Sequence, residues 1–116
     1  MTTKRQKIVN ETLTALAPMM PMEDGQKVRA MANRQRLRSL QAQTAVWLSL
    51  VAYIRHVHTD YDEMLDDGYD RDSARHFVLD DINDVIQHWQ GTRFLTFEDD
   101  AMDADIPVEE PLQGPG

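Results

Sequence analysis

Side chains that could bind a ligand or catalyse a reaction are concentrated directly after the most apolar stretch of the chain. Within eight residues follow Arg55, His56, His58, Thr59 and Asp62. If this segment is helical, His58 reaches Asp62 at a spacing of four residues. Arg55 reaches Thr59 in the same way, so these four side chains share one flank. Such a flank is either a polar network that fixes the helix to its neighbours or a binding surface, and a catalytic or metal site is the remaining alternative.

The histidines do not by themselves indicate a metal site. His56 points roughly opposite to His58 on a continuous helix, so the two cannot chelate one ion unless the helix breaks near Thr59. Asp84 and His88 could complete a two-histidine carboxylate site with His58, but we prefer a solvated pair. The chain has no cysteine, glycine-rich phosphate loop, nucleophile elbow or HExxH motif. We therefore predict a non-enzymatic protein with no catalytic residues, no cofactor and no metal.

Charge is distributed unevenly along the chain. Residues 1–55 carry nine Lys/Arg and three acids, a net charge of +6, whereas the remaining residues carry three Arg and seventeen acids, a net charge of −14. Either the basic half packs against the acidic half, or the two halves present separate faces to different partners.

The basic half contains an arginine series that could follow the phosphates of a nucleic acid, consisting of Arg29, Arg34, Arg36 and Arg38. Against nucleic-acid binding, the net charge is −8 and no aromatic residue is interleaved with the basic ones. The competing interpretation is that these arginines pair with the aspartate-rich last helix.

The acidic half suggests a basic protein as the partner instead of a nucleic acid. Seven acids between residues 60 and 72, followed by an acidic C-terminal segment, could present a phosphate-like surface to a basic protein. Small nucleic-acid mimics of phage or plasmid origin inhibit nucleic-acid-binding machines in this way. A solvated helix face is the simpler alternative.

The elements that must position these residues are all helices. We predict an all-α, four-helix bundle-like domain over residues 1–95, with helices at about 3–16, 24–37, 45–67 and 71–90. The third is apolar on all sides over its first ten residues, so the others must cover it. We expect it to continue through Thr59, although a break there is the alternative. Residues 96–116 are read as a disordered acidic tail.

The last helix has the clearest apolar face, which includes Phe77 and Trp89, and Asp70 is its predicted N-cap. Asp81 falls inside this apolar sector, where an unpaired carboxylate would be costly. We therefore expect Arg55, a histidine or Tyr53 to pair with it. Three methionines lie beside Pro18 and Pro21, and we expect them to fill an apolar corner: Met19, Met20 and Met22.

The runs R-H-x-H-T-x-Y-D-x-x-L and G-Y-D-R-D-x-A-R, over residues 55–65 and 68–75, resemble a small, mainly bacterial domain-of-unknown-function family with the signature R-H-x-x-T-x-Y-D … G-x-D-R-x-x-A-R. The resemblance covers roughly residues 30–95. It implies signature positions without implying an activity, and those positions are Arg55, His56, Thr59, Tyr61, Asp62, Asp70 and Arg75.

These observations favour a cytoplasmic interaction or regulatory protein that binds a macromolecular partner through charged helical faces. We see no signal peptide, and the most apolar run is about half of the ~20 residues that a membrane span needs, so no membrane contact is expected. Another protein is the preferred partner, with nucleic acid or a second copy of the chain as alternatives. The candidate binding surface consists of Arg55, His56, His58, Thr59, Tyr61, Asp62, Asp70 and Arg75.

Overall fold

The computed structural model describes residues 3–102, with side chains through residue 100. Its elements are α1 (Lys4–Leu16), α2 (Met22–Ala32), the 3₁₀ helix η1 (Gln35–Leu37), α3 (Ala42–Val57), α4 (Tyr61–Asp66), α5 (Arg71–His88) and α6 (Phe97–Met102). The described residues contain no strand, so the predicted all-α class is confirmed. None of these helices combines the length and apolarity needed to cross a membrane. Predictions for residues 1–2 and 103–116 lie outside the described residues.

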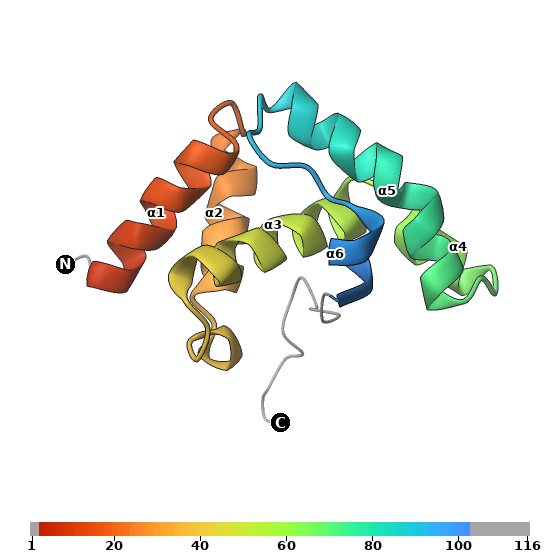
Figure 1. Cartoon of the computed structure of the whole chain (residues 1–116), viewed down its shortest axis with the longest axis horizontal. Coiled ribbons are helices and arrows are strands. Elements are labelled where there is room, and N and C mark those ends of the chain that lie inside the picture. Colours follow the sequence, from red (N-terminus) through yellow and green to blue (C-terminus); the bar gives the residue numbers. More distant parts are fainter. Residues whose placement is uncertain (1–2, 103–116) are drawn as a thin grey trace.

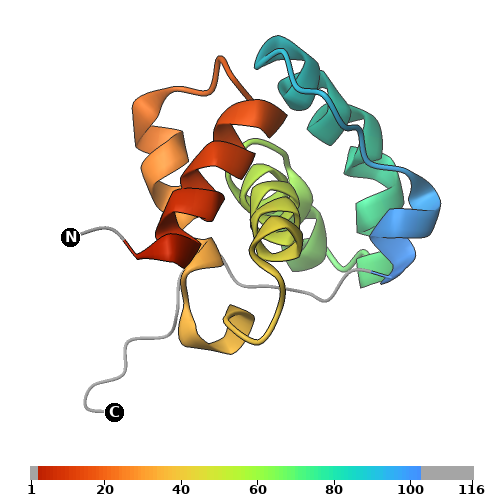
Figure 2. The same ribbon diagram turned by 60° about the vertical axis from the view of Figure 1, so that its left-hand side comes forward.

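Helix α3 crosses the middle of the molecule (Figure 1). Helices α1 and α2 pack against it from one side and α5 from the other, as the turned view in Figure 2 shows. Val46, Leu50 and Ile54 are at most 1% exposed. Each such side chain contributes about 1.5–3 kcal/mol by leaving water. The prediction of a central helix that the others cover is therefore confirmed.

The predicted continuation of this helix through Thr59 is wrong, and the break that we considered as the alternative is observed. Helix α3 ends at Val57, and α4 begins at Tyr61. The Thr59 hydroxyl donates to the carbonyl of Arg55 and accepts from the backbone N–H of Tyr61. A side chain that bonds locally to the backbone in this way offers an alternative to the helical hydrogen bonds. The break turns the chain, so residues on either side no longer share a flank.

Both long flanking helices begin at side-chain caps. Thr3 and Gln6 form a reciprocal capping box at the start of α1. Asp70 accepts a 2.7 Å hydrogen bond from the backbone N–H of Ser73, as predicted for the N-cap of α5. That bond and one from the Ser73 hydroxyl hold the pKa of Asp70 below its usual value.

The ends of α1 and α5 meet at Gly91. The Gly91 N–H bonds to the carbonyl of Ile86, and the next residue, Thr92, donates to the carbonyl of Leu16. A Cβ at Gly91 would lie 2.4 Å from an Ile86 methyl carbon and 2.9 Å from the Leu16 carbonyl oxygen. Glycine is therefore required here by close approach of two helix ends.

The second helix is shorter than predicted, because the chain leaves it at Ala32 and forms a loop with η1 before α3. Arg5 of α1 holds this loop. Its guanidinium donates to the carbonyls of Ala32, Leu37 and Leu40 at 2.9–3.2 Å. One charged side chain thus satisfies three carbonyls that the helix end and loop leave without intrahelical partners.

The helical domain extends beyond the predicted boundary at residue 95. After α5 the chain returns across α3, where the Arg93 guanidinium lies 4.0 Å from the ring centre of Trp47. Leu95 is buried, and its backbone N–H and carbonyl both bond to the Asn83 side chain. Residues 97–102, predicted as part of a disordered tail, form α6 against α5, because Asp100 pairs with buried arginines.

Candidate functional site

Two buried arginines hold one buried carboxylate where α3, α5 and α6 meet. Arg55 Nη2 lies 2.5 Å from Asp100 Oδ1. Arg75 Nη1 lies 3.9 Å from the same oxygen and donates to the Asp100 carbonyl at 2.9 Å. The side chains are 1%, 9% and 6% exposed for Arg55, Arg75 and Asp100. We call these three residues the arginine clamp. Buried charges must be paired to be tolerated, so the clamp fixes α6 in place.

Tyr61 forms one wall of the arginine clamp. The Arg55 guanidinium lies 5.7 Å from the centre of the Tyr61 ring, and Tyr61 is fully buried. Its hydroxyl has no hydrogen-bond partner among the described residues. The family resemblance marked Arg55, Tyr61 and Arg75, and the structure brings all three together. Sequence reasoning missed Asp100, because its neighbours have the composition of a disordered segment.

A second cluster, the histidine junction, joins α2 to the end of α3 and consists of Asp24, Tyr53 and His58. Asp24 Oδ1 accepts from the Tyr53 hydroxyl at 2.6 Å and lies 2.9 Å from His58 Nε2. The His58 ring also makes an edge contact with Trp89, at 5.4 Å between centroids. Compared with the clamp, this junction is more open to water, since the His58 side chain is 33% exposed.

The partners of Asp24 change its pKa. Burial of the carboxylate raises the pKa, but the hydrogen bonds from Tyr53 and His58 and the nearby positive charge outweigh burial, so the pKa of Asp24 lies below its usual value. Burial and the bond to Asp24 raise the pKa of the Tyr53 phenol, which therefore stays protonated. The junction thus favours an ionised carboxylate held by two donors.

The predicted common flank of Arg55, His58 and Asp62 is wrong. Arg55 points to α6 and His58 to α2, whereas Asp62 of α4 lies 2.7 Å from His56 Nδ1. The His56 ring packs edge-on against Tyr61. The physical reason is the helix break, which sends these side chains to three different neighbours. These side chains therefore pair with residues of other elements instead of forming one surface, an arrangement that resembles the polar-network alternative.

The remaining predicted site residues lie apart. Thr59 bonds to the backbone at the break, and Asp70 caps α5. Asp84 and His88 are exposed on α5. No group of three or more His, Cys, Asp or Glu that could hold a metal ion occurs among the described residues. Asp81 is also exposed, so its predicted burial is wrong, because the apolar face of α5 is rotated away from it.

A family model matches residues 12–90, which run from α1 to the end of α5. The chain belongs to DUF2293, a family of uncharacterized conserved proteins. No curated protein and no solved structure matches it. The match agrees with the predicted membership of a domain-of-unknown-function family and extends the similarity towards the N-terminus.

The DUF2293 match includes only two of the three residues of the arginine clamp. Arg55 and Arg75 lie inside the matched residues, whereas Asp100 lies ten residues after their end. In this chain the DUF2293 unit therefore supplies both cations of the clamp, and a segment that follows the unit supplies the carboxylate.

Four exposed basic residues lie at one end of the helical domain, which we call the basic end: Lys4, Lys7, Arg36 and Arg38. Lys27, Arg71 and Arg93 are also exposed, but they lie on α2, at the start of α5 and after α5. The η1 loop and the start of α1 lie side by side there (Figures 1 and 2). The prediction that the arginines pair with the last helix fails for Arg38, which donates to the Asn33 carbonyl of its own loop.

An acidic face with two aromatic side chains lies on α5 and on the turn that joins α4 to α5. Phe77 and Tyr69 are 60% and 47% exposed and meet edge-on at 5.9 Å. The placement of Phe77 in the apolar core face was therefore wrong. Exposed acids occupy the next positions on the same side of α5, and we define the acidic face as Tyr69, Phe77, Asp80, Asp81 and Asp84.

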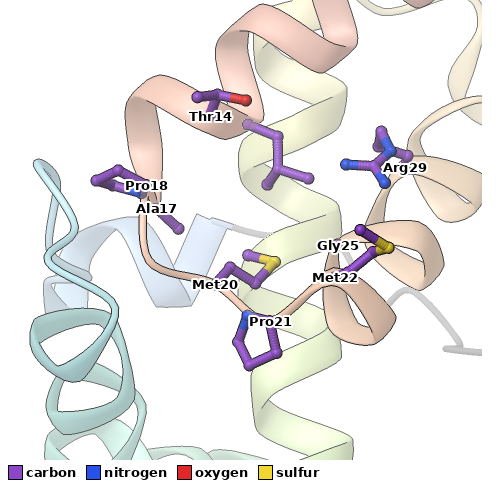
Figure 3. A pocket seen from close by; sticks show the side chains of 9 residues that line it. Thr14, Ala17, Pro18, Met20, Pro21, Met22, Gly25 and Arg29 are labelled. Atoms are coloured by element: carbon purple, nitrogen blue, oxygen red, sulfur yellow. The ribbon is translucent and has the colours of Figure 1, made fainter.

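Arg29 of the predicted arginine series lies away from the basic end, in an open groove of about 430 Å³ between α1 and α2. Figure 3 shows Met20, Met22 and Arg29 around this groove. Met22 is 76% exposed and Met19 is 60% exposed, so the expectation that these methionines fill an apolar corner fails for both. The four arginines therefore do not form one stripe.

Proposed function

We propose that this DUF2293 protein is a non-enzymatic interaction protein that binds a basic partner protein through its acidic face. The observation that carries the proposal is the exposed edge-on pair of Phe77 and Tyr69. Aromatic side chains that remain in water as a pair, within a polar surround, are typical of the centre of a protein interface.

The aromatic pair continues into a row of four rings. His76 lies 6.3 Å from Phe77 and stacks on Phe97 at 4.6 Å. Phe97 is itself 53% exposed. This row offers apolar contact area to a partner, and the carboxylates beside Phe77 offer charge to a basic one. Complementary charge accelerates encounter and selects the partner, while the buried rings would supply most of the affinity.

The test is a comparison of partner capture by three full-length chains: wild type, Tyr69→Ser/Phe77→Ser, and the control Met22→Ser, whose side chain is 76% exposed in the groove. The partner recovered from the native host would be identified, purified and titrated against each chain. We expect the double variant to lose about 2–4 kcal/mol of binding and the control to lose none. Equal affinity of all three chains would contradict the proposal.

A second candidate function is nucleic-acid binding by the basic end. The observation that favours it is the Arg5 guanidinium, which holds the loop carrying Arg36 and Arg38 beside the start of α1. Cations more than 28 residues apart in the sequence are thus brought to one end. An electrophoretic shift with single- and double-stranded probes should weaken steeply as salt rises, and Arg36→Ala/Arg38→Ala should flatten this dependence. The matched control is Lys27→Ala on α2, and an absent shift at low salt would remove this candidate.

Nucleic-acid mimicry is a special case of the first proposal. Its basic partner would be a nucleic-acid-binding protein, and Asp80→Asn/Asp84→Asn should weaken binding because these acids would stand for phosphates. Competition between the chain and nucleic acid for the purified partner distinguishes mimicry from other uses of the acidic face.

A further inference from the structure

Helix α6 contacts the DUF2293 unit as a short peptide ligand would. Its Phe97 stacks on His76, with 11° between the ring planes, and three residues later Asp100 enters the arginine clamp. The backbone N–H of Asp99 is capped by Thr96. The two anchors are one helical turn apart, so both face the same surface.

The clamp supplies the specificity of this contact. Arg55 and Arg75 are almost completely buried. Arg75 forms an ion pair with the carboxylate of Asp100 and donates a hydrogen bond to its main-chain carbonyl. Charge-assisted bonds to a buried carboxylate are stronger than neutral ones. A six-residue helix is not stable in isolation, so the order of α6 comes from its anchors.

The geometry of the site leaves room for another peptide segment to replace α6. An opening of about 140 Å³ remains beside the anchors, lined by Asp72, Arg75, His76, Phe97 and Asp100. Phe97 is also 53% exposed, so the segment rests on the surface at this anchor. Moreover, α6 follows the family match and is joined to it only through residues 91–96.

We propose that Arg55, Arg75 and His76 form a recognition site for acidic peptide segments with the pattern Phe-x-x-Asp, and that α6 is a tethered occupant of this site. A segment of the same pattern in another protein competes with α6 for the arginine pair. This site goes beyond the proposed function, because it selects an acidic partner through buried cations, although it shares His76 and Phe97 with the row of rings. Tethering gives α6 a high effective concentration, so a competitor binds the wild-type chain weakly.

The test uses a fluorescent peptide of residues 94–102 and full-length chains. We expect Asp100→Ala to bind this peptide at least about ten-fold more tightly than the wild type, because the tethered carboxylate is gone. The matched control chain is Asp99→Ala, whose carboxylate is 43% exposed and faces Arg93; it should bind like the wild type. A peptide carrying Asp100→Asn should not bind the Asp100→Ala chain, whereas a peptide carrying Asp99→Asn should.

A second measurement covers the case in which Asp100→Ala does not fold. The described residues and the whole sequence lack cysteine, so Glu98→Cys offers a single labelling position on the exposed side of α6 with the clamp intact. We expect millimolar native peptide to increase the mobility of a spin label there, and the peptide carrying Asp100→Asn to leave it unchanged. Equal effects of the two peptides, or no effect of either, would overturn the proposal.

Discussion

The arginine clamp and the histidine junction each join helices through one aspartate, but they differ in burial and in the partners of that aspartate. Asp100 lies between two guanidiniums that cannot lose their charge, at a buried contact of α3, α5 and α6. Asp24 lies between a phenol and an imidazole, and the imidazole is 33% exposed. From this comparison we expect burial and the chemistry of the partner to decide how much each carboxylate contributes to the free energy of unfolding.

The largest effect is expected for Asp100→Ala, because two buried cations lose a carboxylate. Breaking a buried ion pair by removing one partner costs about 3–5 kcal/mol. Chemical unfolding should show this loss, whereas the matched variant Asp99→Ala removes a surface pair and should change the free energy of unfolding by less than about 1 kcal/mol. Similar values for the two variants would mean that the clamp does not hold α6.

A smaller effect is expected for Asp24→Ala, which removes the acceptor of the buried Tyr53 hydroxyl. An unsatisfied buried donor costs about 1–3 kcal/mol, while the partly exposed His58 ring can bond to water instead. The same unfolding experiment measures it. A loss as large as that of Asp100→Ala would show that the difference in burial between the two clusters is not decisive.

Tyr53→Phe should have a still smaller effect, since it removes one hydrogen bond and keeps the ring that packs against His58. We expect a loss of about 1 kcal/mol, because Asp24 retains the bond to His58. Thermal unfolding of this variant beside Asp24→Ala separates the contribution of the hydroxyl from that of the carboxylate. If Tyr53→Phe lowers the stability as much as Asp24→Ala does, the bond from His58 does not support Asp24 as we expect.

The smallest expected effect is a change in the pH dependence of stability. The pKa of Asp24 is lower in the folded chain than in the unfolded chain, where an aspartate titrates near 4. Its stabilising contribution is therefore complete above about pH 4 and is lost as the pH falls through the folded pKa. The free-energy difference between wild type and Asp24→Asn should shrink between pH 6 and pH 3, and a difference that stays constant would contradict the assignment.

The sequence allowed the local parts of this fold to be predicted. The all-round apolar pattern around Val46–Ile54 indicated the central helix, and Asp70 indicated a helix start, because both signals lie within a few neighbouring residues. The break at Thr59 depends on a hydroxyl that competes for backbone groups, and hydrophobic spacing does not report such competition.

The site was less predictable because its pairs are distant in sequence. His58 and Asp62 have helical spacing, yet His58 pairs with Asp24, thirty-four residues away. Asp100 and Arg55 are forty-five residues apart, and the acidic composition around Asp100 suggested disorder. The packing of α3 against α2 and α5, together with that of α6 against α5, brings these partners together.

The most direct measurement of the clamp is a double-mutant cycle between Arg55→Met and Asp100→Leu in the full-length chain, with the free energy of unfolding as the readout. We expect the loss of stability in the double variant to be smaller than the sum of the two single losses by about 1–3 kcal/mol, because each single variant removes one member of a buried charge pair and the double variant removes both. If the two losses add within about 0.5 kcal/mol, Arg55 and Asp100 do not act as a pair and α6 is not held by the clamp.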